Sequence, residues 1–140
     1  MQNAVEQIIV ETRVDAPIAK VWDAYVTPAD IMQWNAASDD WHTTKSTVDL
    51  REGGLFSSRM EAKDGSFGFD FAGTYTKVEP QRLIAYDMGD RSATVEFLPE
   101  GDAVVVRVTF DAESENPIDM QRQGWQAILD NFKRHVEASA

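Results

Sequence analysis

An amphipathic stretch over residues 117–136 constrains the possible fold of this chain more than any other segment. At about 100° per residue, its large apolar side chains fall on one side of a helix and most of its charged residues on the other. Asn116 as a capping residue, Pro117 at the first helical position and Asp119 in the first turn predict where the helix begins. The apolar side consists of Ile118, Trp125, Ile128, Leu129, Phe132 and Val136. The sequence therefore predicts one long helix with a single face to bury.

Two residues interrupt this apolar face, and both indicate space beneath the helix. Gln121 carries an amide that needs hydrogen-bond partners when it is buried, and either a ligand or solvent at a cavity mouth would supply them. Gly124 lies at the edge of the face, where glycine costs a helix interior about 1 kcal/mol. This glycine either admits a ligand or permits close approach of the helix to a sheet. We expect the helix to cover a cavity as well as a packed core.

The preceding residues show patterns typical of strands and of short helices. Residues 4–14 alternate with period two, which indicates a half-buried strand. Two short helices are predicted next, one of about ten residues from Pro17 and one capped by Thr27 with Trp34 on its buried side. A change of the apolar side in the longest later strand predicts a bulge or bend near Gly73. Six such later strands are predicted, at residues 42–50, 55–62, 67–79, 83–88, 92–98 and 103–110.

Together these elements predict an α+β fold made of one domain over residues 1–140. Consecutive strands joined by tight turns form an antiparallel meander, and the strand at residues 4–14 completes a seven-stranded twisted sheet. One face of that sheet must be covered, and only the helix at residues 117–136 is long enough to cover it. The two short helices can then close one end of the sheet.

Composition and charge disfavour several classes of function. The chain has 140 residues, 43% of them hydrophobic, which is sufficient for a self-contained core. It contains no cysteine and only two histidines, His42 and His135, so neither a zinc or thiolate site nor a cofactor is expected. The net charge of −11 disfavours contact with nucleic acid or an anionic membrane surface. No targeting or membrane-spanning pattern is present, so we expect a cytoplasmic protein. We expect it to be either a monomer or a homodimer.

Several short motifs occur in an order that is similar to that of a known family. The motifs are Val14-Asp15-Ala16-Pro17 running into Val21-Trp22, Thr27-Pro28 with Trp34, residues 49–56 (DLREGGLF), Gly73-Thr74-Tyr75 with Val78-Glu79-Pro80 and Leu83, and Gly124-Trp125 with Leu129 and Phe132. With them the sequence resembles the activator of heat-shock protein 90 ATPase homologue-like family. That family belongs to the START-related SRPBCC superfamily of helix-grip proteins. The resemblance spans the whole chain, and in combination the motifs are fairly specific.

The resemblance implies a deep, largely apolar cavity between the sheet and the long helix. Across the superfamily such cavities hold lipids, polyketides, hormones and other hydrophobic small molecules. We therefore expect this chain to bind a hydrophobic or aromatic small molecule. Two alternatives stay open, because some relatives are aromatase or cyclase enzymes and the namesake domain binds and stimulates a chaperone. The chain could instead be a cyclase, dehydratase or hydrolase that uses the cavity, or a module that activates the ATPase of heat-shock protein 90.

Ten residues are predicted to line the ligand site, and no catalytic or metal-binding residue is assigned. His42 shares one predicted strand face with Thr44, Ser46 and Val48. It is therefore either an inward group able to shuttle protons or a solvated residue at the start of a strand. The ten predicted residues are Trp34, His42, Phe56, Met60, Phe69, Tyr75, Tyr86, Gln121, Gly124 and Trp125.

The aromatic candidates have a structural interpretation beside the functional one. Tyr75 and Tyr86 are expected to point inward from adjacent strands, where their hydroxyls either orient a ligand or serve in structural hydrogen bonds. Trp125 either forms a wall of the cavity or fills the core. An enzyme of this type would need at least two polar groups that converge on one point. The candidates for that convergence are His42, Tyr75, Tyr86 and Gln121.

Overall fold

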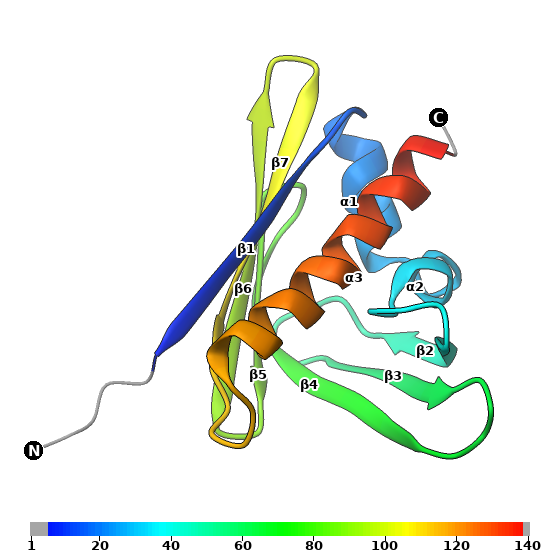
Figure 1. The fold of residues 1–140 in the computed structure, drawn as a ribbon. Helices are drawn as coiled ribbons and strands as arrows, with labels where there is room; N and C mark the ends of the chain where they lie inside the picture. The colour runs from blue at the N-terminus through cyan, green and yellow to red at the C-terminus, as the bar shows by residue number, and fades with distance from the viewer. Residues whose placement is uncertain (1–5, 139–140) are drawn as a thin grey trace, which may run out of the picture.

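The computed structural model describes residues 6–138, which form seven strands and three helices (Figure 1). The predicted order of the elements is confirmed, and residues 4–5 of the predicted first strand lie outside the described residues. In chain order the elements are β1 (Gln7–Val14), α1 (Ile18–Val26), α2 (Pro28–Trp34), β2 (Trp41–Val48), β3 (Leu55–Ala62), β4 (Gly68–Glu79), β5 (Leu83–Met88), β6 (Arg91–Glu100), β7 (Ala103–Asp111) and α3 (Ile118–Ala138).

All seven strands belong to one antiparallel sheet in the order β1-β7-β6-β5-β4-β3-β2. Strands β2 to β7 form the predicted meander, and β1 pairs with β7, so that Ile8 lies opposite Phe110. The sheet curls around α3, and α1 and α2 lie beside the C-terminal part of that helix (Figure 1). This α+β arrangement is the helix-grip fold that the sequence predicts.

The core lies between the sheet and the C-terminal half of α3. Alternating residues of β7 point inward, as the period-two pattern predicts, and Val106 and Phe110 are fully buried. Phe132 of α3 is fully buried too, and its ring packs edge-on against Tyr25 and Trp34 at centroid distances of 5.1 and 5.0 Å. These contacts hold the helix at one end of the sheet, while its N-terminal half lies over a pocket.

The predicted bulge in the longest strand is present, but it lies beyond Gly73. The pairing of β4 with β5 shifts between Tyr75 and Lys77, which accounts for the predicted change of the apolar side. Gly73 has another role, because a Cβ atom there would lie 2.8 Å from the Phe56 ring and 2.5 Å from the Asp87 carbonyl oxygen. The missing side chain therefore lets the Phe56 ring lie across β4.

A second shift in register corrects the predicted orientation of β2. The strand begins at Trp41, and its pairing with β3 shifts between Thr43 and Lys45. Because of this shift, Trp41 and Thr43 share the inner face of the strand with Ser46. His42 lies on the opposite face, so the prediction that it points inward together with Ser46 is wrong.

The second helix begins without the predicted side-chain cap. Thr27 occupies the capping position of α2, but its hydroxyl makes no capping hydrogen bond. Asp30, in the first turn of α2, instead meets His135 near the end of α3, with 2.9 Å between Oδ1 and Nε2. The start of α2 is therefore held by a contact with α3, a helix far away in the sequence, and not by a hydrogen bond from the Thr27 side chain.

Candidate ligand-binding pocket

A pocket of about 540 Å³ lies between the inner face of the sheet and the N-terminal half of α3. Strands β3, β4 and β5 supply much of its floor, and α3 supplies its roof. His42 does not line the pocket, because it lies on the outer face of β2. The other nine predicted residues do, although their contact with a ligand stays a prediction. They are Trp34, Phe56, Met60, Phe69, Tyr75, Tyr86, Gln121, Gly124 and Trp125.

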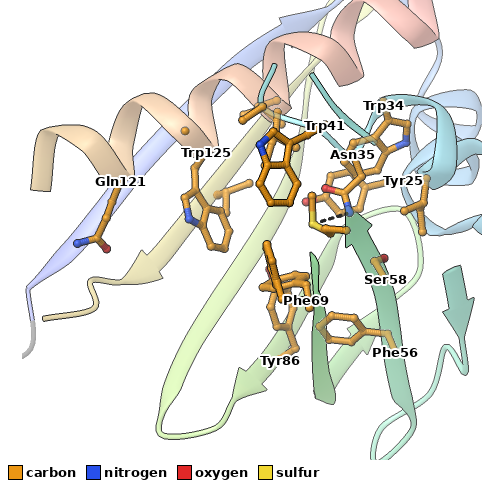
Figure 2. A pocket seen from close by; sticks show the side chains of 18 of the residues that line it. Tyr25, Trp34, Asn35, Trp41, Phe56, Ser58, Phe69, Tyr86, Gln121 and Trp125 are labelled. Carbon is orange, nitrogen blue, oxygen red and sulfur yellow. Dashed lines mark hydrogen bonds between the residues drawn. The ribbon is translucent and has the colours of Figure 1, made fainter. Parts of the chain in front are cut away.

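Aromatic rings make up much of the pocket surface. Trp125 points from α3 toward the sheet (Figure 2) and stacks on Phe110, with ring centroids 3.9 Å apart and planes inclined by 12°. The same indole meets Phe71 edge-on at 6.2 Å. On the floor, Phe56 packs against Tyr86 at 4.9 Å. Trp125 therefore packs against the core and also lines the pocket.

Gly124 faces open space inside the pocket. A Cβ atom at this position would have no heavy atom within 4 Å beyond its own stretch of helix. The interpretation that Gly124 permits close approach of the helix to the sheet is therefore wrong. Glycine lowers the stability of a helix interior by about 1 kcal/mol relative to alanine. A bare stretch of helix backbone thus forms part of the pocket roof.

Gln121 is buried, and the connection between β7 and α3 satisfies its amide. Its Oε1 accepts a hydrogen bond from the Glu113 backbone N–H at 2.9 Å. Its Nε2 donates to the carbonyl oxygens of Glu113 at 3.1 Å and Asn116 at 2.8 Å. Gln121 therefore clamps residues 113–116 against the first turns of α3 and does not need a ligand as a hydrogen-bond partner.

Tyr25, Tyr75 and Tyr86 bring three hydroxyl groups to the lining of the pocket. Tyr75 and Tyr86 lie opposite each other on β4 and β5 and point inward, as the sequence predicts. Burial raises the pKa of Tyr75 to about 12, and burial together with neighbouring phenols raises the pKa of Tyr25 and Tyr86 above the ordinary tyrosine value as well. All three therefore stay protonated at neutral pH. Within residues 6–138 these hydroxyls have no hydrogen-bond partner, so each is free to donate to a ligand.

Exposed apolar side chains mark the opening of the pocket. Phe69 of β4 and Met120 of α3 line it with exposed fractions of 42% and 58%. The Trp41 ring lies 5.9 Å from that of Phe69 and contributes to the same side. Deeper inside, the Asn35 amide donates to the Met60 sulfur at 3.9 Å (Figure 2). An apolar molecule could therefore reach the aromatic floor without crossing a charged rim at this point.

Comparison with known families gives a match over most of the chain. The family described as activator of Hsp90 ATPase homolog 1-like protein matches residues 15–137. The chain belongs to this family. The predicted family and its SRPBCC-type fold are thereby confirmed. No curated protein matches the sequence.

Solved structures of similar proteins support the same assignment. The chain is 49% identical to the AHSA1-like protein from Aeromonas hydrophila, with 96% of this chain and 94% of that chain covered and a TM-score of 0.90. It is 44% identical to a protein from Cytophaga hutchinsonii, with 95% and 93% covered and a TM-score of 0.82. A protein from Chromobacterium violaceum has 22% identity, 94% and 98% coverage and a TM-score of 0.84. At that identity the similarity shows the fold alone.

Among the lining residues that the sequence prediction does not include, three carry polar or aromatic groups of interest. They are Tyr25, Trp41 and Arg91. Tyr25 lies near the end of α1, and helical spacing alone does not distinguish a core residue from a pocket residue. Trp41 is missed because the predicted strand starts at His42, one residue too late. Arg91 is missed because the predicted strand starts at Ser92, although the same alternation extended by one residue would have placed Arg91 on the inner face.

Charged groups are scarce in the pocket. Of the residues that the structure describes, Arg91 is the only positively charged one that lines it and Glu113 the only negatively charged one. Within residues 6–138, no group of three or more His, Asp or Glu side chains is arranged to hold a metal ion.

No helix in the described part of the chain is long and apolar enough to cross a bilayer.

Proposed function

We propose that this protein binds a hydrophobic, partly aromatic small molecule in the pocket between its sheet and α3. The observation that carries the proposal is Gly124, whose missing side chain leaves open space above an aromatic floor. A pocket of about 540 Å³ falls within the range of about 300–1,000 Å³ that is typical of small-molecule sites. Transfer of an apolar ligand onto these rings is favoured by about 25 cal/mol per Å² of apolar surface removed from water.

The polar groups of the pocket suit orientation of a ligand. Tyr25, Tyr75 and Tyr86 present neutral O–H donors, so a carbonyl or ether oxygen of the ligand would find hydrogen-bond partners near the floor. Glu113, the one carboxylate among the described lining residues, already accepts hydrogen bonds from the N–H and Nδ2 of Asn116 at 2.6 and 2.9 Å. Its other oxygen, Oε2, has no partner within residues 6–138, so Glu113 is the one candidate general base, and no imidazole or second carboxylate lines the described pocket beside it. The chemistry of the lining therefore favours binding over the cyclase, dehydratase or hydrolase alternative.

Activation of a chaperone ATPase stays a prediction that rests on the description of the family alone. It would need a partner surface, and it does not require the pocket. Binding of a small molecule and contact with heat-shock protein 90 can be tested separately, because substitutions inside the pocket leave the outer surface unchanged.

The test uses the uncharged fluorescent probe N-phenyl-1-naphthylamine with three variants of α3. Gly124→Leu places a branched side chain in the open space and is expected to weaken probe binding at least tenfold. Gly124→Ala adds one methyl group, should retain binding and should raise the free energy of unfolding by up to about 1 kcal/mol. Gln123→Leu adds a leucine on the exposed side of the same helix and serves as the matched control.

Two results would contradict the proposal. One is a titration of the wild-type protein in which the probe fluorescence rises without reaching saturation. The other is equal affinity of Gly124→Leu and Gln123→Leu for the probe, which would place the bound probe outside the pocket. Thermal unfolding of each variant establishes that any loss of binding occurs in a folded protein.

A further inference from the structure

Arg91 stands out because its charged side chain lies on the inner face of the sheet. It begins β6, where alternate residues point toward the core, and Ala93, Val95 and Phe97 follow it on the same side with at most 2% of their surface exposed. An alternating strand would normally place an apolar residue at this position. Arg91 instead lines the pocket near the loop that joins β7 to α3.

The guanidinium of Arg91 has almost no partners. Nη1 donates one hydrogen bond of 3.3 Å to the Asp111 carbonyl oxygen, and within residues 6–138 the group forms no ion pair. A guanidinium carries five N–H donors, so most of its capacity is unused. By contrast, six of the eight arginines of the chain form ion pairs with carboxylates. These six are Arg13, Arg51, Arg59, Arg82, Arg107 and Arg122.

The surroundings of Arg91 in the pocket lining are largely apolar and include one carboxylate, that of Glu113. Glu113 follows Asp111 by two residues, and its Oε1 is engaged by the N–H and Nδ2 of Asn116. Trp125, which stacks on Phe110, lines the same pocket as Arg91. The positive charge of Arg91 also acts on the Tyr86 hydroxyl, where it partly opposes the rise in pKa that burial and the neighbouring phenols cause. Arg91 is therefore close to both the roof and the floor of the pocket.

From this arrangement we infer that the ligand is an amphipathic carboxylate whose anionic group pairs with Arg91 and whose apolar or aromatic body extends past Trp125 and Tyr86. The inference rests on the proposed function and specifies the chemical class of the ligand. A carboxylate matches the planar fork of a guanidinium and makes charge-assisted hydrogen bonds. A singly charged head group also suits a protein with a net charge of −11 better than a doubly charged phosphate does.

The test compares two ligands that differ only in their head group, 6-phenylhexanoate and 6-phenylhexan-1-ol. Their dissociation constants are measured by isothermal titration calorimetry on the wild-type protein and on Arg91→Gln, Arg91→Lys and Arg82→Gln. Arg82 lies on the turn before β5 with 80% of its side chain exposed, so Arg82→Gln makes the same change of charge away from the pocket. Circular dichroism establishes that each variant is folded.

The wild-type protein and Arg82→Gln are expected to bind the carboxylate about tenfold more tightly than the alcohol. Arg91→Gln should bind the two ligands with similar affinity, because the charge that distinguishes their head groups is gone. Arg91→Lys should keep part of the preference, because lysine retains the charge but loses the fork.

The outcomes separate this inference from the proposed function. If the wild-type protein binds the alcohol and shows no preference for the carboxylate, the pocket function stands and the assignment of Arg91 is overturned. A preference that persists in Arg91→Gln overturns it as well. If the wild-type protein binds neither ligand, the proposed function fails together with the inference. If Arg91→Gln does not fold, the comparison of the two ligands on the wild-type protein and on Arg91→Lys still tests whether the carboxylate pairs with Arg91.

Discussion

The two halves of α3 lie against very different surroundings. In the C-terminal half, Phe132 and Val136 are fully buried against the sheet and the two short helices. In the N-terminal half, Met120 is 58% exposed and Gly124 faces open space. One continuous helix is therefore a core element at one end and a pocket roof at the other. The difference shows how a helix-grip protein can keep a pocket without losing its fold, since the packed contacts of the helix are concentrated away from the pocket.

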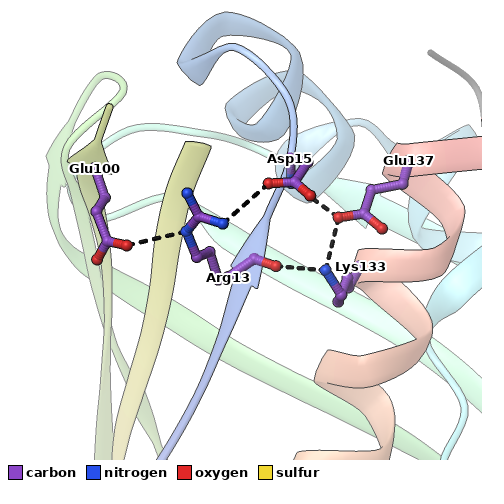
Figure 3. A network of polar contacts seen from close by, with 5 residues as sticks. All are labelled: Arg13, Asp15, Glu100, Lys133 and Glu137. Carbon is purple, nitrogen blue, oxygen red and sulfur yellow. Dashed lines mark hydrogen bonds and ion pairs between the residues drawn. The ribbon is translucent and has the colours of Figure 1, made fainter. Parts of the chain in front are cut away.

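A polar network reinforces the packed end of the helix (Figure 3). Lys133 donates to the Arg13 carbonyl oxygen at 2.6 Å and pairs with Glu137 at 2.7 Å. Glu137 accepts a hydrogen bond of 2.8 Å from the Asp15 backbone N–H. Arg13 in turn pairs with Asp15 at 3.3 Å and with Glu100 at 2.9 Å. These groups join the C-terminal turns of α3 to the end of β1.

The largest effect that distinguishes the two halves is expected from truncation of Phe132. Phe132→Ala removes a fully buried ring that touches Tyr25 and Trp34, and it should lower the free energy of unfolding by about 3–5 kcal/mol. Met120→Ala, in the exposed half of the same helix, should change it by no more than about 0.5 kcal/mol. Urea unfolding followed by circular dichroism measures both values. Similar losses in the two variants would mean that the two halves are equally important for stability.

A smaller effect is expected from the one buried clamp of the pocket half. Gln121→Ala removes three hydrogen bonds and leaves the Glu113 and Asn116 backbone groups without these partners, so the free energy of unfolding should fall by about 1–3 kcal/mol. Gln123→Ala is the matched control, because that amide is exposed two residues further on. Urea unfolding of both variants tests this. An equal and small loss in the two would mean that the loop does not depend on the Gln121 amide.

The smallest effect is expected from the ion network, and it depends on pH. The Asp15 backbone N–H and the Lys133 side chain lower the pKa of Glu137 from its ordinary value of 4.5. A lowered carboxyl pKa stabilises the folded state fully above pH 4.5 and loses this effect as the pH falls through the lower folded value. Glu137→Gln should therefore cost below about 1 kcal/mol at pH 7, and less below pH 4.5. Urea unfolding midpoints of the wild-type protein and Glu137→Gln are measured at roughly pH 3 to 7, a range that includes the titration of Glu137. A difference in stability that grows toward low pH would contradict the role given to Glu137.

The sequence predicts the packed half of the molecule better than the polar details of the pocket. Regular alternation places Val106 and Phe110 inside, and helical spacing does the same for Phe132, because burial of large apolar side chains follows directly from these periods. The two shifts in strand register were harder to predict. The residues at the β2 shift, around Thr44, are ordinary strand formers, and the strand that they pair with sets where the extra residue is accommodated. One such shift moves His42 to the outer face.

The role of Gln121 could not be read from the sequence for a similar reason. Its position on the apolar face of α3 is evident from helical spacing, but its partners belong to an irregular connection eight and five residues earlier. An irregular loop has no periodicity from which its path can be derived. The sequence leaves open whether a ligand or solvent at a cavity mouth meets the Gln121 amide, and the structure shows a buried amide whose partners are backbone groups of residues 113–116.

The pairing of β1 with β7 has a consequence for how the protein folds. Gln7 and Asp111 are hydrogen-bonded although 104 positions separate them, and the network at the end of β1 also anchors α3. Contacts of such long range form slowly, because a long loop must close before they can stabilise the chain. During synthesis, β1 has to wait for β7 before it can pair, and α3 finds its polar anchors only on a β1 that is already in place. The roof of the pocket is thus expected to be the last element to dock.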